Sequence, residues 1–274
     1  MTGGVHFMRH ERWADALFLH YECQPQELQR MLPPGLCVDT IGGRAYVGVI
    51  ALSEQGISPV LPMFTWVNGL LRRFLGLSHH AVNVRTYVRP AGGGRAGIYF
   101  FTLDCSSALP TFGARALFNL PYRLASMRRQ TSSEGTFRFT SERRTLLGAE
   151  PSAEIEVEWE ADGGASEADA LGAFFAERYC LYCEAGPVLR TLAMPHGSDP
   201  PSLWRGTITH APWPLQKVCP RIKRNSMLGS VGVDVALTQA ARDGAVVAHF
   251  SPGVSAIEFF WEPLVSSAKL KAAD

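Results

Sequence analysis

Short apolar runs separated by turn-forming residues constrain the fold of this chain more than any other feature. The runs at 82–88 and 98–103 flank the glycine-rich stretch 91–94, so they predict a β-hairpin. Further runs typical of strands cover residues 47–52, 136–140, 154–159, 203–210, 231–237, 245–250 and 256–261. Many strands with few helices favour an antiparallel barrel or sandwich with helices packed outside it.

Helical periodicity is confined to a few segments. Residues 24–32 precede a Pro-Pro pair that ends a helix, and residues 110–129 predict one or two helical pieces broken at Pro121. The clearest helix runs from 167 to about 182, where apolar residues recur at three- and four-residue steps.

Composition and charge limit the domain organisation and the partners. The 274-residue chain is 46% hydrophobic, which is enough to bury a large core. Because no repeat or low-complexity linker is evident, we expect a single domain over 1–274, with its core at about 10–262 and a flexible C-terminal tail at 263–274. The formal net charge of +1 provides no field that attracts nucleic acid, so none is expected as a partner. The sequence leaves open whether the protein forms a homo-oligomer.

The apolar stretch at 59–77 does not have the pattern of a membrane span. Asn68, Arg72 and Arg73 interrupt it, whereas a spanning helix needs about 20 nearly uncharged residues. The N-terminus also lacks the apolar core of a signal peptide. We therefore expect no transmembrane segment and a cytoplasmic location. An amphipathic segment that lies on a membrane or a partner remains an alternative for this stretch.

No motif in the sequence predicts a metal or a cofactor. Cys180 and Cys183 form a CxxC pair, but no second pair accompanies it, which disfavours zinc and leaves a redox role open. The adjacent His79 and His80 point in opposite directions in an extended chain. Phosphate-binding loops, serine-hydrolase elbows and zinc-protease motifs are absent.

The strand at 82–88 carries the most informative polar residues. Side chains alternate along a strand, so Asn83, Arg85 and Tyr87 share one face, opposite an apolar face. The neighbouring run at 98–103 is apolar on both faces, which indicates an inner position where an arginine must be paired. Two partners stay open for Arg85: the carboxylate of Asp104, or the carboxylate of a ligand, which a guanidinium binds with two hydrogen bonds.

Several clusters together resemble a known family. The matching stretches are residues 32–39, 83–88, 97–104, 114–122, 177–182, 210–216 and 251–254. In this order they are similar to the YqjF-like bacterial family of uncharacterised proteins, in the acetoacetate decarboxylase-like superfamily. The resemblance implies an α+β, β-rich fold: a cone-shaped antiparallel barrel with a few peripheral helices around a central cavity.

The resemblance also implies which positions of this chain correspond to the catalytic lysine of the decarboxylases. The decarboxylases of this superfamily form a Schiff base through a buried lysine in a Tyr-Pro-Lys-Lys segment. In the similar segment of this chain, Tyr122 and Arg123 stand at the two lysine positions. The chain has only four lysines, which are Lys217, Lys223, Lys269 and Lys271. Arginine stays protonated and is no nucleophile, so imine chemistry is not expected.

Three functions fit these observations. The first is a small-molecule-binding barrel for a partly apolar ligand that can carry a carboxylate. Its predicted binding residues are Asn83, Arg85, Tyr87, Arg115, Arg123, Arg178 and Trp213. The second is a non-covalent acid/base enzyme of the decarboxylase, isomerase or hydratase type, acting on a keto or carboxylic acid with Tyr122 and His210 as catalytic residues. The third is a partner- or membrane-surface-associated protein that uses 59–77.

Overall fold

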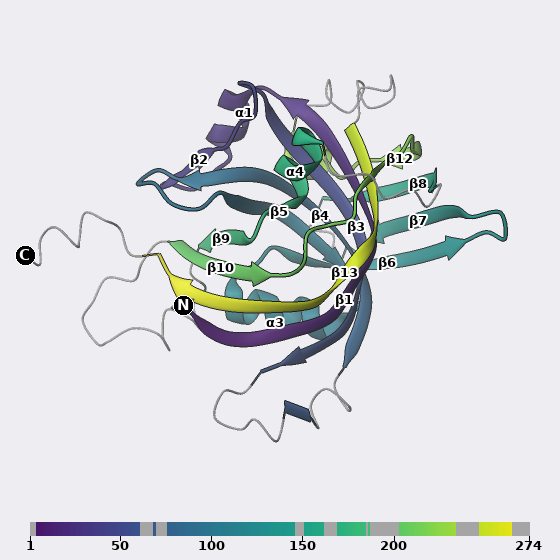
Figure 1. The fold of residues 1–274 in the computed structure, drawn as a ribbon, viewed down its shortest axis with the longest axis horizontal. Coiled ribbons are helices and arrows are strands. Elements are labelled where there is room, and N and C mark those ends of the chain that lie inside the picture. Colours follow the sequence, from purple (N-terminus) through teal and green to yellow (C-terminus); the bar gives the residue numbers. More distant parts are fainter. Residues whose placement is uncertain are drawn as a thin grey trace, which may run out of the picture.

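Seven strands close a barrel in the computed structural model, which describes residues 4–60, 68–69, 76–145, 151–161, 169–184, 186, 203–233 and 247–264 (Figure 1). Around the barrel they are β5 (Gly97–Cys105), β9 (Cys180–Glu184), β10 (Leu203–Thr209), β13 (Val247–Pro263), β1 (Val5–Cys23), β3 (Ala45–Pro59) and β4 (Leu77–Pro90), which returns to β5. The pairings are antiparallel except for β5–β9. The prediction of a β-rich barrel is therefore confirmed, with one parallel pair added.

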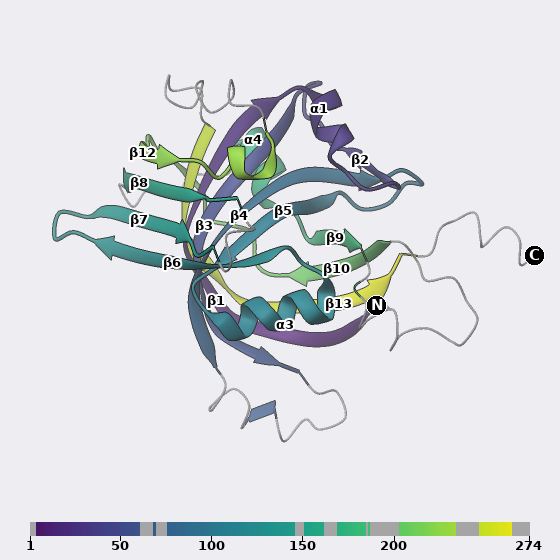
Figure 2. The same ribbon diagram turned by 180° about the vertical axis from the view of Figure 1, so that it is seen from behind.

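A second sheet continues from β5 and folds away from the barrel. Its strands are β6 (Tyr122–Thr131), β7 (Thr136–Arg143), β8 (Glu154–Glu160) and β12 (Arg221–Asn225). Because β6 runs parallel to β5, the chain needs a crossover between them, and helix α3 (Ala108–Phe118) supplies it (Figure 2). The remaining elements are α1 (Pro25–Arg30), α4 (Ala170–Ala176), β2 (Leu36–Val38), β11 (Gln216–Lys217) and the 3₁₀ turn η1 (Gly229–Val231).

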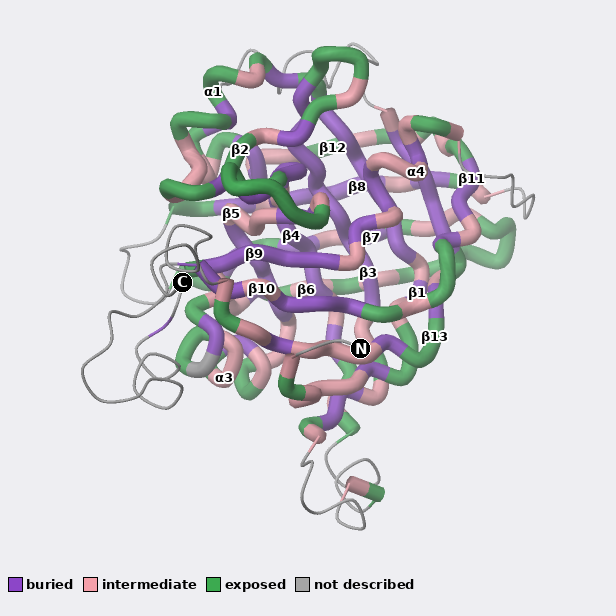
Figure 3. Tube along the Cα trace, turned by 60° about the vertical axis from the view of Figure 1, so that its left-hand side comes forward, coloured by how far each residue is buried: buried purple, intermediate pink, exposed green. Residues whose placement is uncertain are grey.

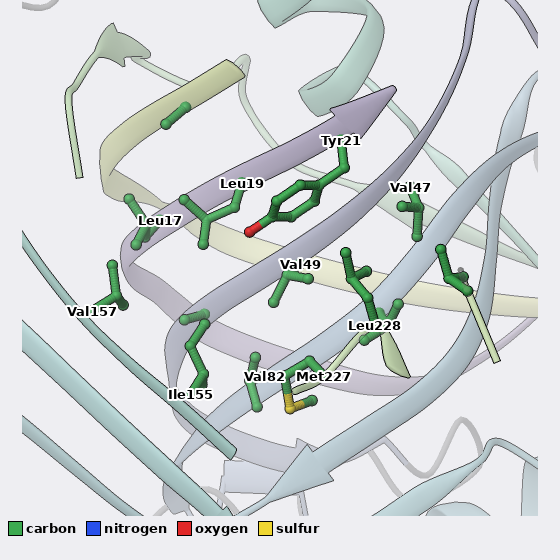
Figure 4. Packing of buried hydrophobic residues seen from close by; sticks show 14 of the residues in the cluster. Leu17, Leu19, Tyr21, Val47, Val49, Val82, Ile155, Val157, Met227 and Leu228 are labelled. Atoms are coloured by element: carbon green, nitrogen blue, oxygen red, sulfur yellow. The ribbon is translucent and has the colours of Figure 1, made fainter. Parts of the chain in front are cut away.

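Consecutive residues are buried along several strands of the barrel wall (Figure 3), so both faces of these strands are covered. Phe18 of β1 and Ile50 of β3 point into the barrel and belong to the interior core. Leu19 and Val49, one residue away, point outward and belong to a second cluster that also contains Ile155 of the second sheet (Figure 4). Strands buried on both sides read as continuous apolar runs, which explains the pattern of the sequence here.

Several sequence expectations need correction. Residues 247–250 and 256–261 belong to one strand, β13, rather than two, and residues 245–246 lie outside the described residues. The helix expected over 110–129 ends at Phe118, and the strand β6 follows after Pro121. The helix expected over 167–182 ends at Ala176, so the CxxC pair lies in a strand. In the run at 231–237, Val231 ends the turn η1, and residues 234–237 lie outside the described residues.

The cysteines of the CxxC pair are buried and do not face each other. Cys180 and Cys183 are three residues apart in β9, so their side chains point to opposite faces of the strand. Burial raises the pKa of Cys183 to about 12, which keeps this thiol protonated and unreactive. All six cysteines are unpaired thiols.

Two other expectations concern segments that the structure describes only in part. Most of 59–77 and the tail beyond Leu264 lie outside the described residues. No helix in the described part of the chain has both the length and the apolar character needed to span a membrane.

Candidate functional site

The barrel encloses a cavity of about 350 Å³ with a mostly apolar wall. Polar atoms enter it from His10, Glu54, His79, Asn83, Arg85, Tyr122, Arg178 and His210. Most of the remaining wall is aliphatic or aromatic, including Phe18, Ile50, Leu52, Ile98, Phe100, Leu103, Phe118, Trp213, Phe259 and Trp261. A concave apolar site with a few convergent polar groups is the usual form of a small-molecule site.

Strand β4 supplies polar groups at successive levels of the cavity. His79, Asn83 and Arg85 all line it, as the alternation of side chains requires. Tyr87, the next inward residue, is fully buried below them and shares a 2.5 Å hydrogen bond with Nε2 of His20. Phe175 of α4 stacks on His20 at 3.7 Å, so this packed layer forms the floor of the cavity rather than its lining.

Arg85 is a cation without a carboxylate partner among the residues that the structure describes. Its Nη2 donates to the backbone oxygen of Phe175 at 3.1 Å, and its Nε is buried without a hydrogen-bond partner. The Oδ1 atom of Asn83, a residue only 5% exposed, also lacks a donor. Strand β4 thus presents an unneutralised charge on Arg85 and an unused hydrogen-bond acceptor on Asn83, two residues apart.

The pairing of Arg85 with Asp104, one of the two alternatives from the sequence, is wrong. Asp104 is fully buried and accepts two hydrogen bonds from Arg143, at 2.7 and 3.0 Å. Arg143 lies on β7, 39 residues away in the sequence, and reaches β5 because the second sheet joins the barrel there.

Of the other predicted binding residues, some line the cavity and some do not. Arg178 lines the cavity, but its Nη1 donates to Asp39 at 2.6 Å, so its charge is compensated. Arg115 and Arg123 are not among the described lining residues, and both donate to the backbone oxygen of Tyr122. Trp213 lines the cavity and stacks on the ring of Trp13 with centroids 5.8 Å apart.

Both predicted acid/base residues line the cavity. Burial, together with the charge of Glu54, raises the pKa of Tyr122 well above its ordinary value, so the phenol is neutral at pH 7 and available as a donor. Burial lowers the pKa of His210, whose Nδ1 lies 2.7 Å from the carbonyl oxygen of Ala211. Because a carbonyl only accepts, Nδ1 carries the proton and Nε2 is left as an acceptor.

A cluster of ionisable groups that the sequence reasoning missed lies at the other end of β4. Glu54 of β3 and His79 of β4 are direct partners in the strand register, and Oε2 of Glu54 lies 3.1 Å from Nε2 of His79. His10 of β1 completes the cluster at 3.9 Å from the same oxygen. The paired histidines at 79–80 were a signal, but their carboxylate partner lies 25 residues earlier and becomes visible only through the register.

The charges of this cluster follow from its surroundings. Burial by itself would lower the pKa of His79, but the adjacent Cys105 and the Glu54 carboxylate outweigh it and raise the pKa to about 10. Burial lowers the pKa of His10 to about 4. Glu54 and His79 therefore form an ion pair at neutral pH, beside a neutral His10.

This ion pair predicts a pH dependence of stability. The pKa of His79 is about 10 in the folded protein and 6.5 ordinarily, so between these pH values the folded state holds a proton that the unfolded state has lost. The contribution of this proton to the free energy of unfolding is complete below pH 6.5 and is lost as the pH rises to 10. Urea unfolding at several pH values should show a steeper decline for the wild type than for His79→Gln. The difference between the two slopes isolates the contribution of His79. Equal slopes in the two proteins would contradict the assignment.

Neither described lysine enters the cavity. Lys217 is 70% exposed at its side chain and forms a 2.6 Å ion pair with Asp169. Lys223 pairs with Glu158 on the second sheet at 2.5 Å. The described part of the chain also contains no group of three or more His, Cys, Asp or Glu side chains arranged to hold a metal ion.

Solved structures define the class of this barrel. An acetoacetate decarboxylase aligns over 97% of this chain and 91% of its own, with a TM-score of 0.60 and 13% identity. The acetoacetate decarboxylase of Legionella pneumophila aligns over 97% and 89%, with a TM-score of 0.56 and 12% identity. The enduracididine biosynthesis enzyme MppR, complexed with pyruvate, aligns over 97% and 92%, with a TM-score of 0.56 and 13% identity. The chain has the acetoacetate decarboxylase-like fold.

Sequence comparison identifies the family within this class. Residues 10–255 match DUF2071, a family described as an uncharacterised conserved protein, and the chain belongs to this family. The uncharacterised protein YqjF of Bacillus subtilis (strain 168) is 28% identical over 234 residues, which cover 84% of each chain. The family resemblance drawn from the sequence motifs is confirmed.

Proposed function

We propose that the barrel binds a small, partly apolar carboxylic acid whose carboxylate pairs with Arg85. The observation that carries this proposal is the position of the Arg85 guanidinium, which lines an apolar cavity and has no carboxylate partner in the described part of the chain. A half-buried charge without compensation is costly, and a ligand carboxylate removes that cost through two hydrogen bonds. The apolar wall then contacts the hydrocarbon part of the ligand.

The binding is proposed to be non-covalent. A Schiff base needs an amine nucleophile in the cavity, and the outward positions of Lys217 and Lys223 speak against one. Tyr122 lines the cavity where the family resemblance puts the lysine of the decarboxylases. The pyruvate complex of the structural neighbour MppR supports a carboxylate as the ligand class.

Binding of decanoate, compared with decanol, tests the role of Arg85. We expect calorimetry to detect decanoate binding that Arg85→Gln weakens by about 10- to 100-fold, which corresponds to about 1.5–3 kcal/mol for a charged hydrogen bond. Decanol should bind both proteins alike, because it has no charge to lose. Arg44→Gln serves as the matched control, since Arg44 is exposed and pairs with Glu22 on the outside.

Two outcomes would contradict the proposal: equal decanoate affinity in Arg85→Gln and the wild type, or equal wild-type affinity for decanol and decanoate. Native mass spectrometry of the purified protein adds an independent measurement, in which a copurifying carboxylic acid supports the proposal.

An acid/base enzyme acting in the same cavity is the second candidate function. The observation that favours it is the Glu54–His79 ion pair, which lines the cavity together with Tyr122. His210 stays a predicted acid/base residue on the Arg85 side. Association with a partner or a membrane surface through 59–77, a cytoplasmic location and a homo-oligomer remain predictions from the sequence.

A further inference from the structure

Glu54, His79 and Tyr122 approach the cavity from three strands of the two sheets. Glu54 and His79 face each other across β3 and β4, and their side chains are 12% and 2% exposed. Tyr122 of β6 is the register partner of Leu103, which in turn pairs with Asn83 of β4. Tyr122 lines the same cavity, and the charge of Glu54 acts on its phenol.

We propose that Glu54, His79 and Tyr122 form a proton-transfer site that enolises a ketone group of the bound ligand. The inference rests on the proposed binding of a carboxylic acid, and it assigns that ligand to the keto acids. The carboxylate pairs with Arg85, and the ketone lies further along the apolar wall.

Two donors of this site line the cavity, and one of them, His79, keeps its ion pair with Glu54. Neither ring nitrogen of His79 makes a well-directed hydrogen bond, although the ring is nearly fully buried. Tyr122 lines the same cavity with a neutral phenol, whose O–H group is a donor. A protonated imidazole and a neutral phenol that line one cavity are suited to bind a carbonyl oxygen and to stabilise the negative charge that develops on it.

Glu54 is the base of this site because the alternatives are occupied. It is the only carboxylate among the described residues that line the cavity. His10 is neutral, and its Nδ1 accepts a 2.9 Å hydrogen bond from Nε1 of Trp13, which is a donor only. The proton of His10 is therefore on Nε2, which lies 3.3 Å from the sulfur of Met8.

The proposed step needs no further reactant. Glu54 removes a proton from the carbon next to the ketone, so the C–H bond breaks and a carboxyl O–H bond forms. The electron pair of the C–H bond forms the C=C bond of the enolate, and the carbonyl electrons move to the oxygen, where His79 and Tyr122 stabilise the charge. The carboxyl proton exchanges with solvent, and return of a proton from the carboxyl group to the same carbon restores the ketone.

The spacing of the polar groups defines a ligand with separated functional groups. Arg85 and His79 are six residues apart on β4, which is about 20 Å along a strand, and the inward reach of both side chains shortens this gap. Several carbons therefore separate the carboxylate from the ketone. A suitable probe is 9-oxodecanoate, which has a methyl ketone at the end opposite its carboxylate.

Exchange of the ketone α-protons in D₂O tests the proposal. We expect ¹H NMR to show that the wild-type protein accelerates loss of the methyl-ketone signal of 9-oxodecanoate over buffer. Glu54→Gln and the near-isosteric Tyr122→Phe should each lower the protein-catalysed rate by about a hundredfold, the effect typical of a general base or of an oxyanion donor. Glu22→Gln, which changes an exposed glutamate of β1, should keep the full rate.

Binding of the probe, measured by calorimetry on the same samples, separates the two proposals. Binding without accelerated exchange in the wild type overturns the proton-transfer site and leaves the proposed binding function intact. Full exchange in a folded Glu54→Gln or Tyr122→Phe variant overturns the assigned roles. Absence of probe binding in the wild type contradicts both proposals. A loss of thermal stability with an unchanged exchange rate identifies the ion pair as purely structural.

Discussion

Asp104→Ala should lower the free energy of unfolding by about 3–5 kcal/mol, because it leaves a buried guanidinium without its counter-charge. Arg143 is 2% exposed at its side chain and donates twice to Asp104. Its remaining partners, the hydroxyl of Thr102 and the backbone oxygen of Pro151, carry no charge. Urea denaturation at neutral pH measures the effect directly.

Two further variants test whether the stability lost in Asp104→Ala comes from the unpaired buried charge. The double variant Asp104→Leu with Arg143→Met should recover most of the stability, because a buried ion pair replaced by apolar side chains is often neutral or better. Glu262→Ala breaks the partly exposed pair with Arg205 and should cost at most about 1 kcal/mol. A loss from Asp104→Ala as small as that from Glu262→Ala would contradict the assigned role of the buried pair.

Gly253→Ala should destabilise the protein by at least about 3 kcal/mol, since backbone strain and overpacking act together. Gly253 has φ +120°, and a Cβ atom on it would lie 2.0 Å from the backbone oxygen of Trp13 on the neighbouring strand. Backbone atoms of β1 and β13 must separate to admit it, and the two strands are the longest in the barrel. Thermal unfolding followed by circular dichroism is the measurement.

Gly43→Ala is the matched control for this substitution. Gly43 also has a positive φ, +77°, but a Cβ atom there would meet nothing within 4 Å. Its expected cost is that of the left-handed conformation alone, about 1–2 kcal/mol. If the two variants lost equal stability, the close approach of β1 and β13 at Gly253 would have no energetic role.

The alternation of side chains explains which parts of the site were predictable. It put Asn83, Arg85 and Tyr87 on one face of a strand, and the structure has all three pointing inward. The alternation fails where a β-bulge inserts one residue. In β1, a bulge between Ala14 and Leu17 lets Trp13 and Phe18 both line the cavity, although they are an odd number of positions apart in the sequence.

Long-range pairs account for most of what the sequence reasoning missed. Glu54 and His79, like Asp104 and Arg143, are distant in sequence and meet only through strand register or the join between the sheets. Likewise, β1 was not expected as a strand, because the polar segment at 9–12 breaks the apolar pattern before the buried residues begin.

The sequence by itself determined the barrel class, the family and the inward face of β4, because these depend on local periodicity and on motifs that remain recognisable along the chain. Tertiary structure alone decided which charges are compensated: Asp104 pairs with Arg143, Asp39 with Arg178, and Arg85 with no described carboxylate. The physical reason is that an ion pair depends on the distance between two side chains in space, which strand register, bulges and sheet closure set together.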